Sequence, residues 1–332
     1  MSKAIIYIIS NSNFMAEFIL DEFKDDKNIT LIQFKEKKNA LTAFLKYIRL
    51  KLGNRKGMFN KWLFDPQFLN DIQKINPKDK VLLWSIENYK NTLIIAKEIN
   101  ALHKESFLWN PMLRLRRNKN LANKYMPDMR KNGIRVSTFD YEDSKLLPCR
   151  LVTQVHRRIK LPKTAKKPGG IFFVGQLKGR ENILSKLEAI LTANNIPINF
   201  HLIQSNHHKT IMPDNLMKYI ASSLMSYHDT LLNINQSECL VDIVQPGQTG
   251  LTLRPIEALF YHKKLITNNP LVKNEPFYNK NNVFILGDPS ESRTLNKFIT
   301  DNPYSPVKPE IEQLYHVRHW LTELFNSQDS HL

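Results

Sequence analysis

Short apolar segments alternate with amphipathic ones along almost the whole chain, and this alternation restricts the possible fold more than any other feature. Apolar runs that we predict to be strands occupy residues 4–9, 29–34, 80–86, 106–109 and 134–139. After a gap, further apolar runs occupy residues 171–174, 198–203, 241–244 and 265–267. Strands that alternate with helices are typical of βαβ units, which build a parallel sheet covered by helices. The pattern therefore predicts an α/β protein with parallel sheets.

The alternation is interrupted at residues 161–170, which read LPKTAKKPGG. This stretch has two prolines and a glycine pair and no core pattern, as is usual for a linker. With 332 residues, the chain is long enough for two domains that each bury a core. We predict a Rossmann-like domain over residues 1–160, a linker over 161–170 and a second Rossmann-like domain over 171–308. A last helix is expected within residues 309–332.

The segment from Asp242 to Asn269 has the features of an anion site. A strand end, a loop containing Gly250 and a helix that we expect to begin at Pro255 follow one another. Proline is well tolerated in the first turn of a helix, because its missing N–H would have no intrahelical partner there. Free backbone N–H groups and the helix dipole favour a phosphate or diphosphate at such a place. Glu257, expected in the first turn, could accept hydrogen bonds from sugar hydroxyls.

The residues of this segment also resemble a known family. GLTLRPIEALFYHKKLIT is similar to the donor-binding segment of GT-B glycosyltransferases, and DIVQPGQTGLTLRPIEAL is closer still to bacterial proteins of lipopolysaccharide or capsule assembly. The resemblance implies two Rossmann-like domains with a cleft between them and a final helix that crosses back to the N-terminal domain. It also implies that Glu257 contacts the ribose of a nucleotide-sugar, and that the loop at Gly250, Leu251 and Thr252 holds its diphosphate.

One position departs from the family pattern. The family often has a second glutamate eight positions before the first, and that position is Thr249 in this chain. Either Gln245 or Gln248 could take over its contact with the donor sugar. We therefore include both glutamines among the expected donor-binding residues.

A second stretch, FVGQLKGRENIL, is similar to the first strand, loop and helix of the GT-B donor domain. Gly175 ends the strand, and Lys178 matches the lysine that neutralises the donor diphosphate in that family. Gln176 stands where the family usually has an arginine, so the resemblance leaves Arg180 or Arg254 to supply the second positive charge. Two cations would stabilise the nucleoside diphosphate as it gains negative charge on leaving. The alternative is an ordinary solvated turn.

In a parallel sheet, ligands bind beyond the carboxyl ends of the strands, and this rule selects polar residues of the first domain. Asn11, Trp109 and Asn110 follow apolar runs and are expected to line an acceptor pocket, although the last two could equally be a buried aromatic residue and a turn. Glu87 and Asp140 also follow strands, and either could be the base that takes a proton from the acceptor hydroxyl. The alternative for both carboxylates is a helix cap.

The net charge of +17 calls for an anionic partner, and basic residues are concentrated at residues 35–61 and 114–124. In the first stretch one helical face carries Leu41, Phe44, Leu45, Ile48 and Leu52, with Lys38, Lys46 and Arg49 beside it. This helix either packs on the sheet as an ordinary amphipathic helix or lies against anionic lipid headgroups. No recognition motif for nucleic acid accompanies the charge. The charge therefore favours a membrane surface as a partner and not a nucleic acid.

Disulfides, metals and cofactors are not expected. The two cysteines, Cys149 and Cys239, are far apart and suggest neither a disulfide framework nor a zinc site. His207 and His208 have no third ligand at a recognisable spacing. The aspartate-any-aspartate motif of metal-dependent glycosyltransferases is absent from the sequence, which agrees with a metal-independent reaction.

The first residues, MSKAIIYIIS, are too short an apolar run for a signal peptide, and no apolar run is long enough to cross a bilayer. We therefore expect a cytoplasmic protein that is peripheral on the inner face of the cytoplasmic membrane. The main hypothesis is a glycosyltransferase that moves a hexosyl or other glycosyl group from a nucleotide-sugar to a surface glycan or glycolipid. Lipopolysaccharide, lipooligosaccharide and capsule are the acceptors considered. A noncatalytic nucleotide- or glycan-binding protein and a basic nucleic-acid-binding protein are the alternatives.

Overall fold

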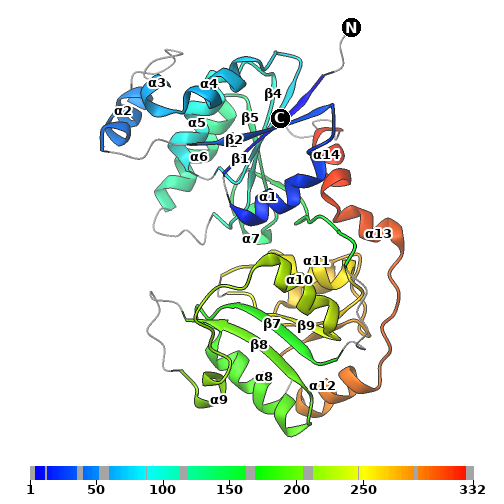
Figure 1. Cartoon of the computed structure of the whole chain (residues 1–332). Helices are drawn as coiled ribbons and strands as arrows, with labels where there is room; N and C mark the ends of the chain where they lie inside the picture. Colours follow the sequence, from blue (N-terminus) through cyan, green and yellow to red (C-terminus); the bar gives the residue numbers. More distant parts are fainter. Residues whose placement is uncertain are drawn as a thin grey trace. The chain divides into compact units, whose positions relative to one another are not determined.

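The computed structural model describes residues 4–11, 13–35, 40–51, 60–86, 88–112, 119–161, 169–204, 212–245, 247–287 and 291–326. It divides into two compact units (Figure 1). Unit 1 comprises Met1–Thr153 and Val317–Leu332, and unit 2 comprises Gln154–His316. The change of unit thus falls between Thr153 and Gln154. Most of the expected linker, residues 162–168, lies outside the described residues.

Unit 1 is built on a six-stranded parallel sheet with the order β2-β1-β3-β4-β5-β6. The strands are β1 (Ile6–Asn11), β2 (Ile29–Phe34), β3 (Lys80–Trp84), β4 (His103–Leu108), β5 (Ile134–Thr138) and β6 (Arg150–Leu151). The helices are α1 (Phe14–Leu20), α2 (Ala40–Lys51), α3 (Asn60–Leu63), α4 (Pro66–Gln73), α5 (Tyr89–Glu98), α6 (Lys119–Lys131), α7 (Tyr141–Leu146) and α14 (Val317–Asn326). A 3-10 turn, η1 (Asp21–Phe23), follows α1.

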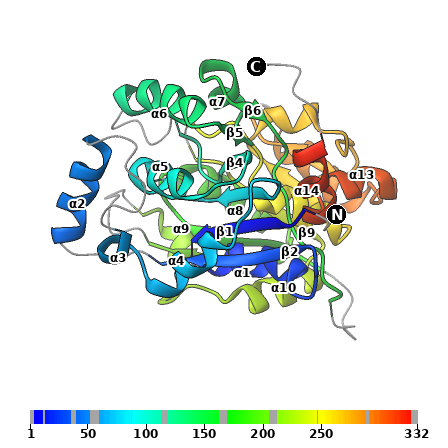
Figure 2. The same ribbon diagram turned by 90° about the horizontal axis from the view of Figure 1, so that it is seen from above.

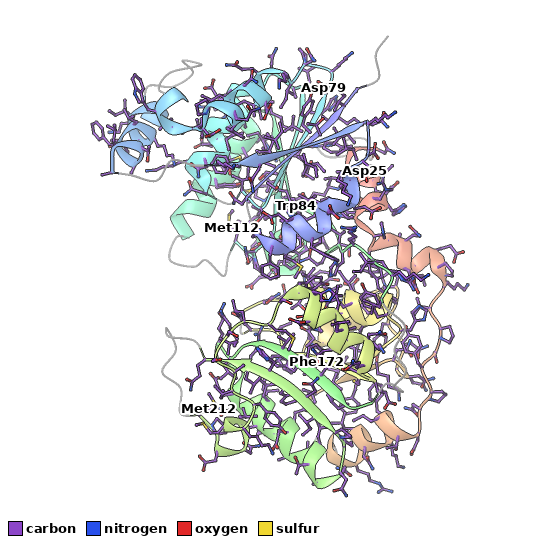
Figure 3. The ribbon with its side chains drawn as sticks, viewed as in Figure 1. Asp25, Asp79, Trp84, Met112, Phe172 and Met212 are labelled. Carbon is purple, nitrogen blue, oxygen red and sulfur yellow. The ribbon has the colours of Figure 1, made fainter. Side chains whose placement is uncertain are left out.

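Alternate residues of the strands of unit 1 face two different helical layers, as the two-residue period of a strand requires. Tyr7 and Ile9 of β1 belong to the core cluster formed with α4, α5 and α6. On the opposite face lie α1 and α14 (Figure 2). There Trp320 of α14 packs against Trp84 and Phe107, with ring centroids 5.5 and 4.9 Å apart. The side chain of Trp84 is completely buried in this layer (Figure 3).

The C-terminal segment forms two helices where the sequence predicted one. Helix α13 (Pro309–Leu314) belongs to unit 2 and α14 to unit 1, with Tyr315 and His316 between them. Arg318 at the start of α14 pairs with Glu22 and Asp26 of unit 1. The last helix therefore completes the core of the unit that contains the N-terminus.

Unit 2 is built on a five-stranded parallel sheet with the order β11-β10-β9-β7-β8. The strands are β7 (Ile171–Gln176), β8 (Ile198–Ile203), β9 (Cys239–Asp242), β10 (Lys264–Thr267) and β11 (Val283–Ile285). The helical segments are α8 (Glu181–Ala193), α9 (Asp214–Met217), α10 (Tyr227–Gln236), α11 (Leu253–Phe260), η3 (Pro270–Asn274), α12 (Glu291–Thr300) and α13. Helices α8, α9 and α12 cover one face of the sheet, and α10 and α11 cover the other, over the buried Phe172 (Figures 1 and 3).

Helix α2 presents only part of its predicted apolar face to the core of unit 1. Leu41 and Phe44 are exposed, whereas Thr42 and Lys46 are buried and Leu45 is partly buried against the core. Spacing identifies the residues that share a helical face, but it does not say which face turns inward. Of the basic and apolar residues expected on this helix, Lys38 and Leu52 lie outside the described residues. Among the described helices, none combines the length and apolar character needed to cross a bilayer.

Candidate functional site

The order of the strands in unit 2 puts its switch point between β7 and β9. The chain runs from β7 to β8 on one side and then returns to place β9 on the other side of β7. In open parallel sheets, ligands bind beyond the carboxyl ends of the strands at this point. The turn after β7 and the loop after β9 both leave the sheet here. These are the two stretches that the sequence selected for donor binding.

The turn after β7 is tight and carries two of the predicted residues. The N–H of Arg180 donates to the carbonyl of Leu177 at 3.0 Å, and the two central residues, Lys178 and Gly179, have φ values of 46° and 86°. Positive φ at both central positions suits glycine and is uncommon for lysine. Arg180 precedes α8 and donates from Nη1 to the carbonyl of Gln176 at 2.8 Å. The guanidinium of Arg180 is thus fixed close to the carboxyl end of β7, and Lys178 belongs to the same turn.

Asp242, at the carboxyl end of β9, organises the loop on the other side of the switch point. It is buried and accepts hydrogen bonds from the hydroxyls of Thr252 at 2.8 Å and Thr267 at 3.1 Å. Burial raises the pKa of Asp242, while the Thr252 hydrogen bond and the charges of Arg180 and Arg254 act in the opposite direction. Because Thr252 caps α11, its hydrogen bond ties the start of that helix to the end of β9.

Helix α11 begins two residues earlier than the sequence predicted. Its N-cap is Thr252, whose Oγ1 accepts the N–H of Arg254 at 3.2 Å. Pro255 is the third helical residue, where its missing N–H still removes no intrahelical bond. Because the helix starts at Leu253, Glu257 lies beyond the first turn, and the expectation of a first-turn glutamate is wrong.

The carboxylate of Glu257 lies in a buried polar cluster of unit 2, with its side chain 2% exposed. Nη1 of Arg254 lies 2.5 Å from Oε2, the hydroxyl of Tyr227 donates to Oε1 at 2.8 Å, and Nε2 of His156 lies 3.5 Å from Oε1. Burial alone would raise the pKa of Glu257, but Arg254 and these hydrogen bonds outweigh it and hold the pKa below its ordinary value. Glu257 is therefore an anion whose charge is matched inside the fold.

The hydrogen bonds of this cluster fix the direction of its protons. Nδ1 of His156 accepts the N–H of Arg157 at 2.7 Å, so the ring proton of the neutral imidazole is on Nε2. That proton points to the hydroxyl oxygen of Tyr227, 2.6 Å away, and the hydroxyl donates in turn to Glu257. Burial and the neighbouring carboxylate raise the pKa of Tyr227, which keeps its proton.

Three residues of this site were not found in the sequence: Asp242, His156 and Tyr227. Asp242 lies inside the strand predicted at residues 241–244, whereas the structure ends β9 at this carboxylate. With that strand end, a carboxylate beyond the core of the strand would have been the available signal. His156 and Tyr227 lie 101 and 30 residues from Glu257 in the chain. A single histidine or tyrosine at such distances belongs to no motif, and the fold alone brings them together.

The other predicted donor-binding residues lie in β7 or in the loop before α11. Gly175 is part of β7, and Gly250 and Leu251 are buried in the loop. The N–H of Gln248 donates to the carbonyl of Gln245 at 3.1 Å. Oε1 of Gln245 is buried and has no hydrogen-bond partner among the described residues. The choice between Gln245 and Gln248 as a ligand of the donor sugar stays open.

The candidates for the acceptor side lie in unit 1. Asn11 is the last residue of β1 and donates from Nδ2 to the carbonyl of Ser85 at 2.7 Å, at the switch point between β1 and β3. Trp109 is half-buried and packs against Trp84 and Phe107, as the buried-aromatic alternative predicted. Asn110 is exposed.

Of the two base candidates, Glu87 lies outside the described residues. Asp140 is buried and caps α7, accepting the N–H groups of Glu142 at 3.0 Å and Asp143 at 3.2 Å. These bonds have the geometry of a helix cap, the alternative considered from the sequence.

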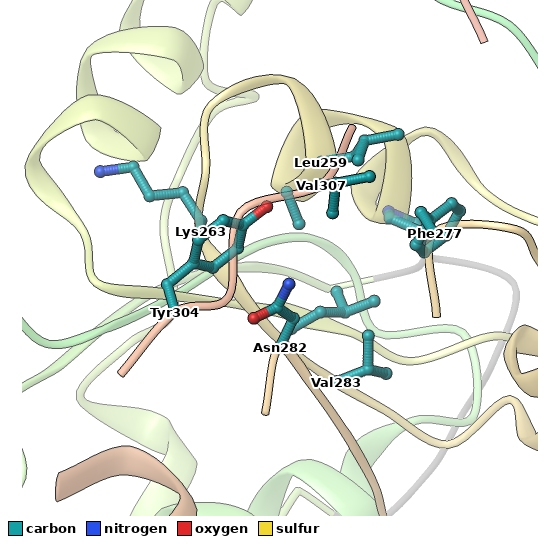
Figure 4. A pocket seen from close by; sticks show the side chains of 10 residues that line it. Leu259, Lys263, Phe277, Asn282, Val283, Tyr304 and Val307 are labelled. Atoms are coloured by element: carbon teal, nitrogen blue, oxygen red, sulfur yellow. The ribbon is translucent and has the colours of Figure 1, made fainter. Parts of the chain in front are cut away.

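A small pocket lies beside α11 (Figure 4). Pro255, Ala258 and Leu259 of this helix line it, and Arg254 and Glu257 do not. Phe277 and Tyr304 also line it, and its volume of about 10 Å³ suffices for one water molecule. It is too small for a nucleotide and is not the proposed donor site. Among the described residues, no cluster of histidine, cysteine, aspartate and glutamate could hold a metal ion. His207 and His208 lie outside them.

Solved structures with a similar fold give this geometry a context. A glycosyltransferase from Rickettsia africae ESF-5 is 11% identical, with a TM-score of 0.51 over 98% of this chain and 100% of that chain. A putative UDP-N-acetylglucosamine 2-epimerase from Listeria monocytogenes is 8% identical, with a TM-score of 0.51 over 98% of each chain. HepE from Anabaena, solved in complex with UDP, is 11% identical, with a TM-score of 0.51 over 89% of this chain and 88% of that chain.

No protein-family model and no curated protein matches the chain. The similar structures have the GT-B fold, and this chain shares it, which confirms the fold predicted from the sequence. At identities of 8 to 11%, the likeness concerns the fold.

Proposed function

We propose that this chain is a glycosyltransferase that binds a nucleotide-sugar in unit 2 and transfers its sugar to a glycan acceptor. The observation that carries the proposal is that both strands at the switch point, β7 and β9, are tied to an arginine-bearing segment. Arg180 is bonded to Gln176 at the end of β7, and Arg254 lies in the first turn of α11, whose cap Thr252 is bonded to Asp242 at the end of β9. Lys178 is on the same turn as Arg180. Three cations at the place where such sheets bind ligands suit a diphosphate. The UDP bound to the similarly folded HepE supports a nucleoside diphosphate as the ligand.

In this proposal the cations stabilise the departing nucleoside diphosphate. Negative charge accumulates on its oxygens as the glycosidic bond breaks, and preorganised cationic donors lower the energy of that state. In this proposal the backbone at Gly250 and Leu251, directly before the Thr252 cap of α11, also contacts the diphosphate. Because side chains supply the positive charge, no divalent cation is needed, and we propose a metal-independent reaction.

Glu257 has two roles in this proposal. It holds Arg254, and each of its oxygens can accept a second hydrogen bond, one of them from a ribose hydroxyl. With its side chain 2% exposed, contact with a ribose would require the loop or Arg254 to shift on donor binding.

We further propose a lipid-linked or lipid A-core glycan of the bacterial surface as the acceptor, in lipopolysaccharide, lipooligosaccharide or capsule assembly. Two features support it: the likeness of the donor segment to proteins of such pathways, and the charge of +17, which favours an anionic membrane surface. The acceptor would approach unit 1, where Asn11 lies at the second switch point.

The test is release of nucleoside diphosphate from a panel of nucleotide-sugars, with and without a metal chelator. We expect turnover of at least one donor that the chelator does not change, and a loss of about tenfold or more in kcat/KM for Arg254→Gln. Lys218→Gln is the matched control, because it removes an exposed cation that pairs with Glu188 away from the switch point. Tight binding of a nucleoside diphosphate without turnover would instead identify a noncatalytic binding protein. Equal activity of Arg254→Gln and the parent would contradict the site.

A further inference from the structure

Helix α2 of unit 1 turns large apolar side chains toward solvent. Leu41, Phe44 and Tyr47 are 55, 59 and 49% exposed, and their three-residue spacing places them along one side of the helix. The buried side of α2 includes Thr42 and Lys46. An ordinary surface helix buries its apolar stripe, whereas α2 packs Leu45 against the core and leaves Leu41, Phe44 and Tyr47 exposed.

The neighbouring helix continues this surface. Trp62 of α3 is 47% exposed, and α3 is in contact with α2. In both views of the chain, α2 stands at the outer rim of unit 1, away from the sheet (Figures 1 and 2). We call the four side chains Leu41, Phe44, Tyr47 and Trp62 the α2–α3 apolar surface. Such large apolar groups on neighbouring helices are a typical sign of an interaction surface.

The part of the sequence that contains α2 and the start of α3 is strongly basic. Residues 35–61 contain nine basic residues and one acidic residue, Glu36, a net charge of 9 − 1 = +8 out of the +17 of the chain. The ammonium groups of Lys51 and Lys90 lie 4.7 and 5.9 Å from the ring centre of Tyr47. Aromatic rings beside lysines match the headgroup region of a bilayer, where rings are partly buried and ammonium groups reach phosphates.

We propose that the α2–α3 apolar surface docks on an anionic lipid bilayer, with Phe44, Tyr47 and Trp62 entering the headgroup boundary. Lys51 and Lys90, which lie beside the Tyr47 ring, would contact lipid phosphates. Helices with apolar aromatic residues on one side and basic residues around them bind membranes in this way. A second copy of the chain is a poor occupant, because it would bring two charges of +8 face to face. The bilayer supplies both the apolar environment and the opposite charge.

The surface lies in unit 1, and the proposed donor site lies in unit 2. Membrane docking is therefore a separate property that does not depend on the proposed glycosyl transfer. Variants of the surface are expected to release nucleoside diphosphate from a soluble donor at the rate of the parent, if the parent does so.

The experiment measures flotation of the full chain with phosphatidylcholine vesicles that contain or lack phosphatidylglycerol. We expect binding to the anionic vesicles alone, and a reduction of about tenfold or more for the triple variant Leu41→Ser, Phe44→Ser and Tyr47→Ser. The control variant carries Leu102→Ser and Leu146→Ser, which remove exposed leucines of unit 1 outside this surface. It should bind as the parent does. Circular dichroism checks that both variants are folded.

Tryptophan fluorescence gives an independent measurement. Trp84 and Trp320 are buried and Trp109 is half-buried, so lipid can change the environment of Trp62 most. A blue shift with anionic vesicles is expected, and Trp62→Phe should remove most of it.

Three outcomes would overturn the proposal. The parent chain could fail to bind anionic vesicles, or the folded triple variant could bind them as well as the parent. Thirdly, the parent could form a dimer without lipid that the triple variant does not form, which would assign the surface to a second copy.

Discussion

Arg254 and Glu257 depend on each other at the centre of the candidate donor site. Nη1 of Arg254 donates to Glu257, and the ring of Phe172 lies 5.8 Å from the guanidinium carbon. No other side-chain hydrogen bond of Arg254 is formed with the described residues. The carboxylate thus fixes the guanidinium from one side and leaves its other N–H groups available. Glu257 could therefore affect donor binding by positioning Arg254 as well as by contacting the ribose.

Inorganic pyrophosphate, which has no ribose, separates these two roles. If Glu257 positions Arg254, Glu257→Gln should weaken binding of both pyrophosphate and a nucleoside diphosphate by about tenfold, as expected for a lost charged partner. In an Arg254→Gln background the same change should add little, because the two residues act together. Isothermal titration calorimetry measures both affinities. Glu188→Gln, at another buried carboxylate that pairs with a lysine, is the control. If Glu257→Gln did not change the affinity for pyrophosphate, Glu257 would not position Arg254 for the diphosphate, and contact with the ribose would be its only role in binding.

The pKa of Glu257 also predicts how stability depends on pH. Its folded-state pKa lies below the ordinary value of 4.5, so the ionised carboxylate stabilises the fold above that pH. This contribution is lost as the pH falls through the folded-state pKa. Near neutral pH, Glu257→Gln should lower the free energy of unfolding by about 3 kcal/mol, as for a broken buried pair. Urea unfolding should show this difference from the parent shrinking below pH 4.5, and a constant difference would contradict the prediction.

At the scale of single residues, the sequence could select only candidates that belong to motifs. Lys178, Arg180 and Arg254 were selected because they adjoin glycine-containing loops at strand ends, and their role in donor binding stays a prediction. His156 and Tyr227 contact Glu257 through the fold alone. The sequence also could not show that Glu257 would be buried, because burial depends on packing from distant segments.

At the scale of elements, the cap of α11 is expected to link stability and binding. Thr252 caps the helix and also donates to Asp242, so Thr252→Ala removes both bonds. Loss of the cap should cost about 1 kcal/mol in the free energy of unfolding. Ser226→Ala removes the comparable cap of α10 and should cost a similar amount. Calorimetry should show weaker nucleoside diphosphate binding for Thr252→Ala alone. Equal losses of affinity in both variants would indicate a general effect of lower stability.

In the turn after β7, two variants separate the effect of the Lys178 charge on binding from the effect of the backbone conformation on stability. Lys178→Asn removes the charge but keeps a residue that tolerates positive φ, so stability should be retained and pyrophosphate affinity should fall several-fold. Gly179→Ala keeps the charge, but at a φ of 86° a side chain costs about 1 kcal/mol. Urea unfolding and calorimetry measure the two effects. An unchanged affinity in Lys178→Asn would show that this lysine does not contact the diphosphate.

Elements with a clear apolar period were predicted well, and the others were not. Residues 198–203 form the expected strand, β8. By contrast, α10, β11 and α12 were not predicted. The sequence of α10, YHDTLLNINQ, has few apolar residues, and its capping serine gave only a weak local signal. The sequence also could not predict which face of α2 is buried, since a helical period does not distinguish a buried face from an exposed one.

At the scale of the molecule, the chain builds two cores and crosses between units twice. It enters unit 2 at Gln154 and leaves it after His316. The segment that enters unit 2 pairs with the segment that leaves it: the N–H of His156 donates to the carbonyl of Tyr315 at 2.9 Å. His156 therefore connects the border of unit 2 to the buried Glu257 cluster. The predicted alternation of strands and helices was sufficient to indicate two sheets. Pairing of segments 160 residues apart was not encoded in any local pattern.

Two separate cores predict two separable unfolding transitions, each sensitive to its own mutations. Trp320→Ala removes an aromatic side chain from between Trp84 and Phe107 in unit 1, and Leu184→Ala opens a cavity in the core of unit 2. Each change should cost about 3 kcal/mol or more in its own unit. A ligand that binds only the folded state of unit 2 raises the stability of that unit, by about 2.7 kcal/mol at a hundred times its dissociation constant. In differential scanning calorimetry, pyrophosphate should therefore raise the midpoint temperature of the unit 2 transition, which Leu184→Ala lowers. It should not change the midpoint temperature of the unit 1 transition, which Trp320→Ala lowers. If both variants and the ligand moved a single transition, the two units would unfold together.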